Sequence, residues 1–441
     1  MPSMPVEQDL QAALAAAVER FDKANPKSKA IHAEATKSLP GGNTRTMLYT
    51  APFPLSIKCG KDCMVTTEDG QDLVNLTGEF SAGLFGHSHP VIHDAVLNVL
   101  DKVGLNVSAC TLHEHLLASE MCQRFALDKV RFTNSGTEAN LNALVAARHF
   151  TRKRKIVVFG GGYHGGVLNF SSGKAASSNV DLDDWIVAKY NSVGSATQAI
   201  RSEGVAAVLV EGMQGASGCI PATAHFLKCI QQTAAEAGAI FILDEVMTSR
   251  LTAGGLASIH GLSPDLKTFG KWLGGGASFG AFGGRHDIMA AFDPRQPDCL
   301  VHSGTFNNNT LTMHLGYTGL HNIWTPHVAN AFTERGERLL ARLNHVTEGT
   351  LLCFTGCGTI INAHFPASGS RTILDCLDAN DIQELKDLFW FDMVEAGFWL
   401  ARRGYIALIL STPDAELDRF VDGVADFVAR HELLTTVDKN A

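Results

Sequence analysis

The sequence predicts an α/β fold in which a doubly wound, mostly parallel sheet is the larger part and a smaller α+β part completes the chain. Short, continuously apolar segments recur at residues 155–159 (KIVVF), 205–210 (VAAVLV) and 239–243 (AIFIL). Such segments are typical of strands that are covered on both faces in a parallel sheet. Helical patterns at residues 138–150 and 225–237 lie among them, with glycine clusters at the turns. Strand and helix therefore alternate, as a doubly wound domain requires.

The order of elements divides the chain into three segments. Residues 1–75 form an N-terminal segment, residues 76–325 the large doubly wound domain, and residues 326–441 a smaller α+β domain that the N-terminal segment completes. The N-terminal segment holds an amphipathic helix around residues 11–21 and a turn at residues 40–43 (PGGN). The C-terminal segment is predicted to hold helices at residues 328–343 and 381–395, strands at residues 358–365 and 405–410, and a closing helix.

Length and composition fit a large globular protein. The 441 residues predict two or three structural units, and 45% hydrophobic with 18% charged residues excludes disorder. The net charge is −9 and no basic stripe is present, so we expect no binding to nucleic acid. No apolar stretch reaches the length of about 18 residues that a membrane span needs. The first residues do not resemble a signal peptide, and we therefore expect a cytoplasmic protein.

The cysteines and histidines do not predict a metal site. Ten cysteines are scattered, and the pairs Cys59/Cys63 and Cys353/Cys357 lack histidine partners at ligand spacing. The two His-x-His pairs lack a framework of carboxylates or thiols. We expect buried thiols in the reduced form, a reducing compartment and no bound metal.

An apolar strand that ends in acidic residues places a carboxylate at the edge of the predicted sheet. Residues 239–246 have the sequence AIFILDEV, so Asp244 falls at the carboxyl edge, where α/β proteins bind ligands. There Asp244 could bind a metal, act as a base, hold a protonated ring nitrogen or cap the next helix. Val246 shares the parity of Asp244, so both side chains face the same space if the strand continues that far.

A second candidate element is the loop at residues 133–138 (TNSGTE), which precedes a helix. It offers the hydroxyls of Ser135 and Thr137, the flexible Gly136, and free backbone N–H groups at a helix N-terminus. Together these groups suit a phosphate. The same hydroxyls could instead cap the helix.

A lysine flanked by glycines is the third candidate, in residues 268–276 (TFGKWLGGG). Gly270 and the triple glycine allow the chain to approach a bound ring closely. A desolvated Lys271 would have a lowered pKa and could form a Schiff base. Lys267 is the competing candidate four residues earlier, and a plain surface position for Lys271 is the other alternative.

These motifs follow one another in an order that is typical of one family. A phosphate loop, an aromatic–glycine stretch at residues 162–165 (GYHG), Asp244 at a strand end and the glycine-flanked Lys271 occur in sequence. From about residue 30 onward the chain resembles the class III aminotransferases, which are fold-type I enzymes that use pyridoxal 5′-phosphate. The motifs that carry the resemblance are NSGTEAN, FGGGYHGG, FILDEVMTSR, FGKWLGGGASFGAFGG and HSGTFNNN. Within this class it resembles the glutamate-1-semialdehyde aminomutase-like branch, and there the β-phenylalanine aminotransferases.

The resemblance implies a role for each matching residue. Lys271 would carry the cofactor on its amine and then move a proton between the substrate carbon and the cofactor. Asp244 would pair with the pyridinium nitrogen and keep it charged, so that the ring can act as an electron sink. Tyr163 would stack on the ring, and Val246 would contact its other face. The phosphate would be bound by Ser135, Gly136 and Thr137.

Two further roles are implied by the same resemblance. Thr305, in residues 302–306 (HSGTF), would add a phosphate contact across a subunit boundary, and this implies a homodimer. Glu211, in residues 210–215 (VEGMQG), would be an acid near the ring. The family usually has proline where this chain has Gly212.

The resemblance also implies a class of substrate. Arg45 and Arg403 match positions that bind carboxylates in the β-phenylalanine enzymes, and the glycine that follows favours Arg403 over Arg402. The expected reaction is a ping-pong transfer of an amino group from an aromatic or apolar β-amino acid to 2-oxoglutarate or pyruvate. Phe80 stands where tyrosine is expected, so the side-chain pocket could differ.

The same motifs are also compatible with other functions. A glutamate-1-semialdehyde 2,1-aminomutase, which moves an amino group within one molecule, would share the cofactor residues. However, residues 169–185 do not resemble the gating loop of the mutases, and Ala216 replaces their asparagine. An ω-transaminase of other amines is a further alternative. A non-catalytic sensor or scaffold would usually lack the lysine or carry a DNA-binding domain, whereas Lys271 and Asp244 are both present.

Overall fold

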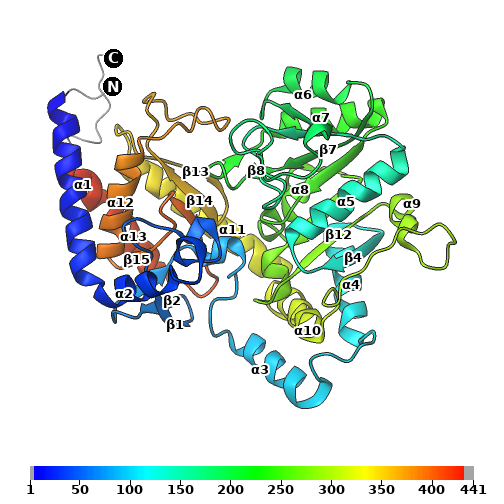
Figure 1. Ribbon diagram of the computed structural model, residues 1–441, viewed down its shortest axis with the longest axis horizontal. Helices are drawn as coiled ribbons and strands as arrows, with labels where there is room; N and C mark the ends of the chain where they lie inside the picture. The colour runs from blue at the N-terminus through cyan, green and yellow to red at the C-terminus, as the bar shows by residue number, and fades with distance from the viewer. Residues whose placement is uncertain (1–3, 432–441) are drawn as a thin grey trace.

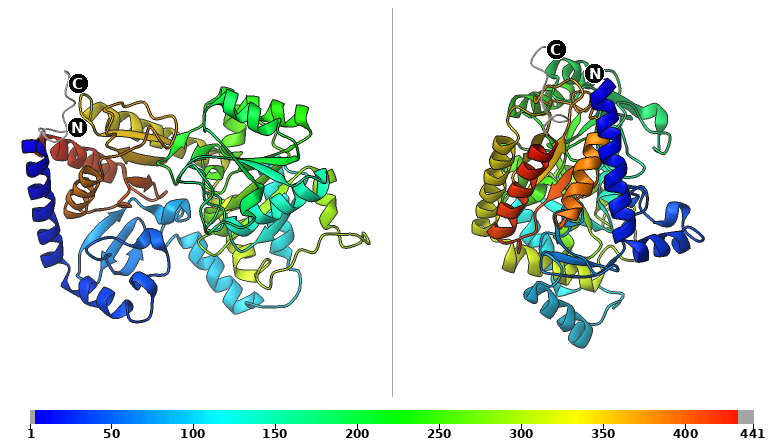
Figure 2. Two further views of the ribbon diagram at one scale, coloured as in Figure 1. Left: turned by 45° about the horizontal axis from the view of Figure 1, so that its top comes forward. Right: turned by 90° about the vertical axis from the view of Figure 1, so that its left-hand side faces the viewer.

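The computed structural model describes residues 4–431, which form two halves that lie side by side (Figure 1). One half is built around a seven-stranded sheet. The other half combines the two ends of the described chain, so that the first helix and the last helix lie in the same half (Figure 2). The boundaries at residues 75 and 325 stay a prediction.

The seven-stranded sheet is mostly parallel, as the sequence predicts. Its second-to-last strand in chain order, β11, continues into the segment that carries Lys271. One strand, β12, runs antiparallel to both of its neighbours, and the remaining pairs are parallel. In spatial order the strands are β4 (Lys129–Thr133), β12 (Gly280–Gly284), β11 (Leu266–Gly270), β10 (Ile240–Asp244), β7 (Val205–Glu211), β5 (Lys155–Phe159) and β6 (Trp185–Ala188).

Helices cover both faces of this sheet, and this explains why its central strands are continuously apolar. Val157 and Val208 belong to one buried cluster, whereas Ile156 and Leu209 belong to another on the opposite face. The helices of this half are α3 (Pro90–Asn98), α4 (Leu112–Phe125), α5 (Gly136–Thr151), α6 (Val193–Ile200), α7 (Ala224–Ala237), α8 (Gly255–His260), α9 (His286–Met289) and α10 (Thr310–Thr318).

The residues at its two ends fix where helix α7, which leads into β10, begins and ends. Thr223 is the N-cap of α7, and its hydroxyl accepts a hydrogen bond from the backbone of Phe226. Gly238 ends the helix in the left-handed conformation, with φ of 61°. The chain then turns directly into the buried strand that carries Asp244 to the edge of the sheet.

The second half contains two small sheets and the helices from the ends of the chain. Helix α1 packs along α12, as Figure 2 shows. The helices of this second half are α1 (Met4–Ala24), α2 (Pro26–Ala35), α11 (Pro326–Val346), α12 (Gln383–Glu395) and α13 (Asp414–Arg430). Its strands are β1 (Ile57–Lys61), β2 (Met64–Thr67), β3 (Asp72–Asn75) and β15 (Phe398–Trp399) in one sheet, and β13 (Cys353–Cys357), β14 (Ile360–His364) and β16 (Tyr405–Ala407) in the other. A hairpin of β8 (Met213–Gln214) and β9 (Ile220–Pro221) leads out of the large sheet.

Three expectations need correction. The strand predicted at residues 405–410 ends at Ala407, because the carbonyl of Leu408 accepts a hydrogen bond from Arg250 instead of a strand neighbour. The strand that carries Asp244 does not continue to Val246. The cysteines are free thiols, but only Cys63, Cys219 and Cys353 are buried.

Among residues 4–431, no helix is both long enough and apolar enough to cross a bilayer. Nor does this part of the chain bring three or more histidine, cysteine, aspartate or glutamate side chains together in a metal-binding group.

Candidate active site

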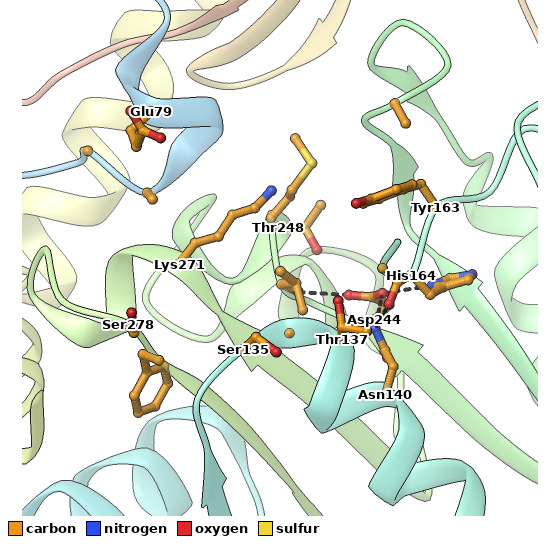
Figure 3. Close-up of a pocket in the computed structure, with 18 of the residues that line it drawn as sticks. Glu79, Ser135, Thr137, Asn140, Tyr163, His164, Asp244, Thr248, Lys271 and Ser278 are labelled. Atoms are coloured by element: carbon orange, nitrogen blue, oxygen red, sulfur yellow. Dashed lines mark hydrogen bonds and ion pairs between the residues drawn. The ribbon is translucent and has the colours of Figure 1, made fainter. Parts of the chain in front are cut away.

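A cavity of about 500 Å³ opens at the carboxyl edge of the large sheet (Figure 3). The strands β4, β11, β10, β7 and β5 all end at this edge, because β12 reverses direction between β4 and β11. The cavity brings together eight of the residues that the sequence singled out. They are Ser135, Gly136, Thr137, Tyr163, Glu211, Asp244, Val246 and Lys271.

Asp244 is buried at the end of β10, and the surrounding donors fix its orientation. Its Oδ2 accepts hydrogen bonds from Asn140 Nδ2 at 2.8 Å and from His164 Nδ1 at 2.7 Å. Its Oδ1 accepts one from the backbone N–H of Val246 at 2.9 Å. The Asn140 side chain is itself held by Thr268, whose hydroxyl donates to Asn140 Oδ1 at 2.7 Å. The carboxylate is therefore held rigidly with one side toward the cavity.

A histidine and a second carboxyl group, His164 and Glu211, lie beside Asp244. Burial acts to lower the pKa of His164, but its hydrogen bond to Asp244 and the charge of that carboxylate outweigh burial and raise it. Glu211 is opposite Asp244 on the neighbouring strand β7. Burial raises the pKa of Glu211 to about 7, although the charge of His164 acts to lower it. These three side chains form a buried cluster under the cavity.

Glu211 also connects two loops at the rim of the cavity. Its Oε1 accepts a hydrogen bond from the backbone N–H of Tyr163 at 2.8 Å, and its Oε2 accepts one from Gly215 at 3.1 Å. Glu211 thus fixes the backbone that carries the Tyr163 ring. The ring itself is 45% exposed and faces the cavity (Figure 3).

Lys271 is the first residue after β11, and its amine points into the cavity (Figure 3). Its φ of 56° is in the left-handed region, which is uncommon for lysine and is typical of functional sites. The next residue anchors this conformation, because the buried Trp272 donates a hydrogen bond to Ser249 Oγ at 2.9 Å. Burial lowers the pKa of Lys271 to about 8, against the opposing charges of Asp244 and Glu211.

The competing lysine has a structural role. Lys267 is buried on β11, and its Nζ donates to the carbonyl of Phe125 at 2.7 Å. It does not line the cavity. Lys271 is therefore the lysine that the fold presents to a ligand.

The loop before α5 has the geometry of an anion site and also caps its helix. Ser135 is the N-cap, and its hydroxyl accepts a hydrogen bond from the backbone N–H of Glu138. The N–H groups of Gly136 and Thr137, in the first turn, have no intrahelical carbonyl to bind. A Cβ at Gly136 would lie 2.8 Å from Val246 Cγ2, so only glycine allows the helix to begin this close to Val246.

Arg45 lies at the rim and does not itself line the cavity. Its Nη1 pairs with Glu79 Oε1 at 2.5 Å, and Glu79 does line the cavity. The guanidinium lies over the Phe80 ring, 5.8 Å from its centroid. Glu79, Phe80 and Ser81 all have positive φ, so this turn holds consecutive residues in the left-handed region.

Arg403 faces a second, smaller cavity and reaches the first through Ala216. Its Nη1 donates to the carbonyl of Ala216 at 3.1 Å, and Ala216 lines the main cavity. Its guanidinium lies over the rings of both Phe80 and Tyr405. Arg402, by contrast, is held by Asp387 through two hydrogen bonds of 2.7 Å. Arg402 is thus occupied by an ion pair, whereas Arg403 lies beside the cavity, and a carboxylate-binding role for Arg403 stays a prediction.

Thr305 is exposed and does not line the cavity of its own chain. Its loop still lies near the phosphate-loop candidate, because Asn134 Nδ2 donates to Asn307 Oδ1 at 2.9 Å.

Several residues of this site have no role that the sequence motifs predicted. His164 and Asn140 occur inside the motifs FGGGYHGG and NSGTEAN, but no role was expected for them. A polar residue that is predicted to be buried and lies next to a strand-end acid in the fold is the signal that could have found them. Glu79 was not singled out, and Thr268 was only the first residue of the segment that contains Lys271.

The comparisons with known proteins establish the family. The model of the aminotransferase class-III family matches residues 48–428. The chain therefore belongs to the class-III aminotransferases, and it is a transaminase that depends on pyridoxal 5′-phosphate.

Individual relatives agree with this assignment. A beta-phenylalanine transaminase of Variovorax paradoxus is 46% identical over 427 residues, which cover 96% of this chain and 97% of that protein. The crystal structure of a beta-phenylalanine aminotransferase from Variovorax paradoxus matches with a TM-score of 0.94 and 44% identity, over 97% of this chain and 99% of that one. A glutamate-1-semialdehyde 2,1-aminomutase of Clostridium tetani is 29% identical, over 90% of this chain and 99% of the relative. The expected fold-type I architecture is thus confirmed.

The residues in the cavity fit the cofactor of this family. An amine with a lowered pKa lies across the cavity from a fixed carboxylate, and a helix N-terminus with unpaired N–H groups adjoins both. These are the groups that an aldehyde, a ring nitrogen and a phosphate require.

Proposed function

We propose that this enzyme transfers the amino group of a β-amino acid with an aromatic or apolar side chain to a keto acid, 2-oxoglutarate or pyruvate, in a ping-pong reaction. The main support for this donor is the similarity to the beta-phenylalanine transaminase. That similarity extends over nearly the whole of both chains. The cavity supports this choice, because two arginines adjoin it from the half that faces the large sheet.

Each residue of the cavity contributes one physical function. When bound, pyridoxal 5′-phosphate supplies a carbonyl that condenses with amines and a ring that accepts electrons. Lys271 would bind that carbonyl and, as a free amine, would take a proton from the substrate carbon and return it. A neutral amine is available near pH 8 because burial has lowered the pKa of Lys271 to about 8.

The remaining residues bind and orient the cofactor. Asp244 would hold the ring nitrogen in its protonated form, and Asn140 and His164 keep the carboxylate in place. Tyr163 and Val246 would contact the ring. Glu211 positions Tyr163 through its backbone. The phosphate would be held by Ser135, Gly136 and Thr137.

The carboxylate of the donor would bind Arg45, which the exposed ion pair with Glu79 holds only weakly. Arg403 would bind a carboxylate next to Phe80, since its guanidinium lies over the same ring as that of Arg45. Guanidinium groups suit this role because they bind a carboxylate through two parallel hydrogen bonds.

The working enzyme would be a cytoplasmic homodimer. Thr305 is exposed in its own chain, and a partner subunit that buries this loop would bring its Thr305 to the phosphate. Light scattering of the purified enzyme should give about twice the chain mass of 47.3 kDa. A monomer that is fully active would refute the role of Thr305.

The donor is tested by a half-reaction without any keto acid. Addition of β-phenylalanine should bleach the visible absorbance band of the bound cofactor, whereas α-phenylalanine and 1-phenylethylamine should bleach it slowly. Bleaching by 1-phenylethylamine alone would indicate an ω-transaminase of other amines. Turnover of glutamate-1-semialdehyde in the absence of a keto acid would indicate an aminomutase, and inertness toward every β-amino acid would refute the proposed donor.

A further inference from the structure

A second cavity of about 230 Å³ adjoins the first one, and the wall between them includes Ala216. Residues of the β8–β9 hairpin, which belongs to the large half, and Lys386 of helix α12, which belongs to the other half, both line it. Its polar lining consists mainly of Ser217, Asn362, Cys376, Asp381, Lys386 and Arg403. This polar and charged lining suits a carboxylate group better than an aromatic ring.

Arg403 presents an unused hydrogen-bonding edge here. Aromatic rings lie against its guanidinium, with the Phe80 and Tyr405 centroids at 5.4 and 5.2 Å from Cζ, so that the edges of the group remain for hydrogen bonds. One nitrogen donates to Ala216 O. The buried Nε has no partner among residues 4–431. A buried donor without a partner is costly, and an anion in the cavity would satisfy it.

Lys386 adds a second positive charge to this cavity. The residue is 7% exposed, and lysine is seldom buried to this extent unless it is paired. Its ammonium pairs with Asp381. That carboxylate also accepts hydrogen bonds from the Phe365 backbone at 2.6 Å and from His364 Nδ1 at 3.2 Å. One carboxylate thus faces two cations, Lys386 and Arg403, and the cavity carries an excess positive charge.

Arg403 links this cavity to the site of the chemistry. Burial is the main cause of the lowered pKa of Lys271 and of Lys386, and the charge of Arg403 lowers both further. Arg403 is therefore within electrostatic reach of both amines. A linear molecule with a carbonyl near Lys271 could pass Ala216 and place a terminal carboxylate next to Arg403.

We propose that Lys386, together with Arg403, binds the distal carboxylate of a dicarboxylic keto acid in the second cavity, and that Lys386 thereby sets the preference for such acceptors over monocarboxylic ones. This inference rests on the proposed transaminase reaction and adds the residue that selects its acceptor. Arg403 alone would bind any carboxylate that reaches it. The second cation, Lys386, favours the longer, doubly charged molecule, whose second carboxylate reaches this cavity.

The kinetic test compares two acceptors with β-phenylalanine as the fixed donor. In Lys386→Met the KM for 2-oxoglutarate should rise about tenfold or more, because a charge-assisted hydrogen bond is lost, while the KM for pyruvate stays within about twofold. Lys386→Arg should keep most of the preference. Lys189→Met is the matched control, since Lys189 pairs with Asp375 at 2.9 Å near the same cavity but is 61% exposed. Equal changes for both acceptors, or no change for either, would overturn the proposal.

A second variant covers the case in which Lys386→Met leaves the buried Asp381 unpaired and the protein unfolds. The double substitution Lys386→Met/Asp381→Asn removes both charges together, and it should give the same rise in KM for 2-oxoglutarate. Thermal unfolding of each variant separates a loss of stability from a loss of acceptor binding. A folded double variant with the acceptor preference of the wild type would also overturn the proposal.

A binding test without turnover uses Cys376, which lines the same cavity. In the wild-type holoenzyme, glutarate should slow the alkylation of Cys376 by iodoacetamide, as measured by peptide mass mapping, and acetate should not. The exposed Cys59 and Cys110 are internal controls that glutarate should leave unchanged. Protection that persists in Lys386→Met would contradict the role of Lys386. Protection in a protein that shows no transamination would refute the proposed function and leave the anion site standing.

Discussion

His164 donates a hydrogen bond from Nδ1 to Oδ2 of Asp244 at 2.7 Å, and both side chains are buried. The other ring nitrogen of His164, Nε2, has no partner among the described residues. The pair lies directly under the cavity that holds Lys271. The histidine thus stabilises the negative charge of the carboxylate that is expected to bind the cofactor ring.

Replacement of His164 should therefore weaken catalysis without unfolding the protein. His164→Phe removes the hydrogen-bond donor to Asp244 and keeps a ring of similar size, so kcat/KM should fall about 10- to 100-fold. Steady-state kinetics with β-phenylalanine, together with a cofactor titration, measure the effect. His345→Phe is the control, because His345 is 83% exposed on α11. If both variants kept wild-type activity, His164 would have no part in holding Asp244.

Lys271 should bind pyridoxal 5′-phosphate covalently, with a rate that depends on pH. Its pKa is lowered to about 8, so the neutral amine appears as the pH rises through about 8 instead of about 10.4. The rate of cofactor uptake by the cofactor-free enzyme should rise over the same range. Borohydride reduction and peptide mapping should label Lys271, while Lys267, held by the Phe125 carbonyl, stays unmodified. Labelling of Lys267 would contradict the assignment.

Glu211 should make stability depend on pH in a predictable direction. Its pKa is about 7 in the folded chain and about 4.5 unfolded, so the folded state binds more protons between these values. The contribution of Glu211 is fully present below about pH 4.5 and is lost as the pH rises through 7. The stability of the wild type relative to Glu211→Gln should fall by about 3 kcal/mol across this window. Unfolding midpoints at several pH values measure it, and parallel curves would refute it.

Gly280→Ala should displace the candidate phosphate-binding loop at residues 133–138, because the new methyl group would clash with its backbone. A Cβ at this position in β12 would lie 2.1 Å from the carbonyl oxygen of Ser135, so the loop must move. We expect a loss of cofactor affinity of at least about tenfold and a lower melting temperature. Gly194→Ala, on α6, is the control, because a Cβ there contacts nothing within 4 Å and alanine favours a helix. Unchanged cofactor binding in Gly280→Ala would show that the loop tolerates this displacement.

The sequence predicted the elements that depend on local pattern. Continuous apolar segments marked β5, β7 and β10, and the acid at the end of β10 marked the edge of the sheet. Because neighbouring parallel strands end together, Glu211 and Asp244 are directly opposite each other in the structure. Eight predicted residues line one cavity for this reason.

Features that depend on distant contacts were not predictable in the same way. β12 consists largely of glycine because the neighbouring backbone leaves no room for side chains at its glycine positions. A Cβ at Gly283 would lie 2.3 Å from the carbonyl oxygen of Lys129 on β4. The bonds from Asn140 and His164 to Asp244 join residues about a hundred positions apart. Arg403 was singled out from its neighbours in sequence, but the second cavity and its partner Lys386 emerge only when the two halves are assembled.

The reversed strand β12 has a consequence for how this enzyme can diversify. Because it runs antiparallel between β4 and β11, those two strands end at the same edge of the sheet. All the expected coenzyme-binding groups except Thr305 lie at or after the ends of strands that stop there. Arg45, Lys386 and Arg403 arise instead from segments near the two termini of the polypeptide. A lineage, or a protein engineer, could therefore exchange those outer segments to change which molecules are processed while the machinery for the chemistry is inherited intact.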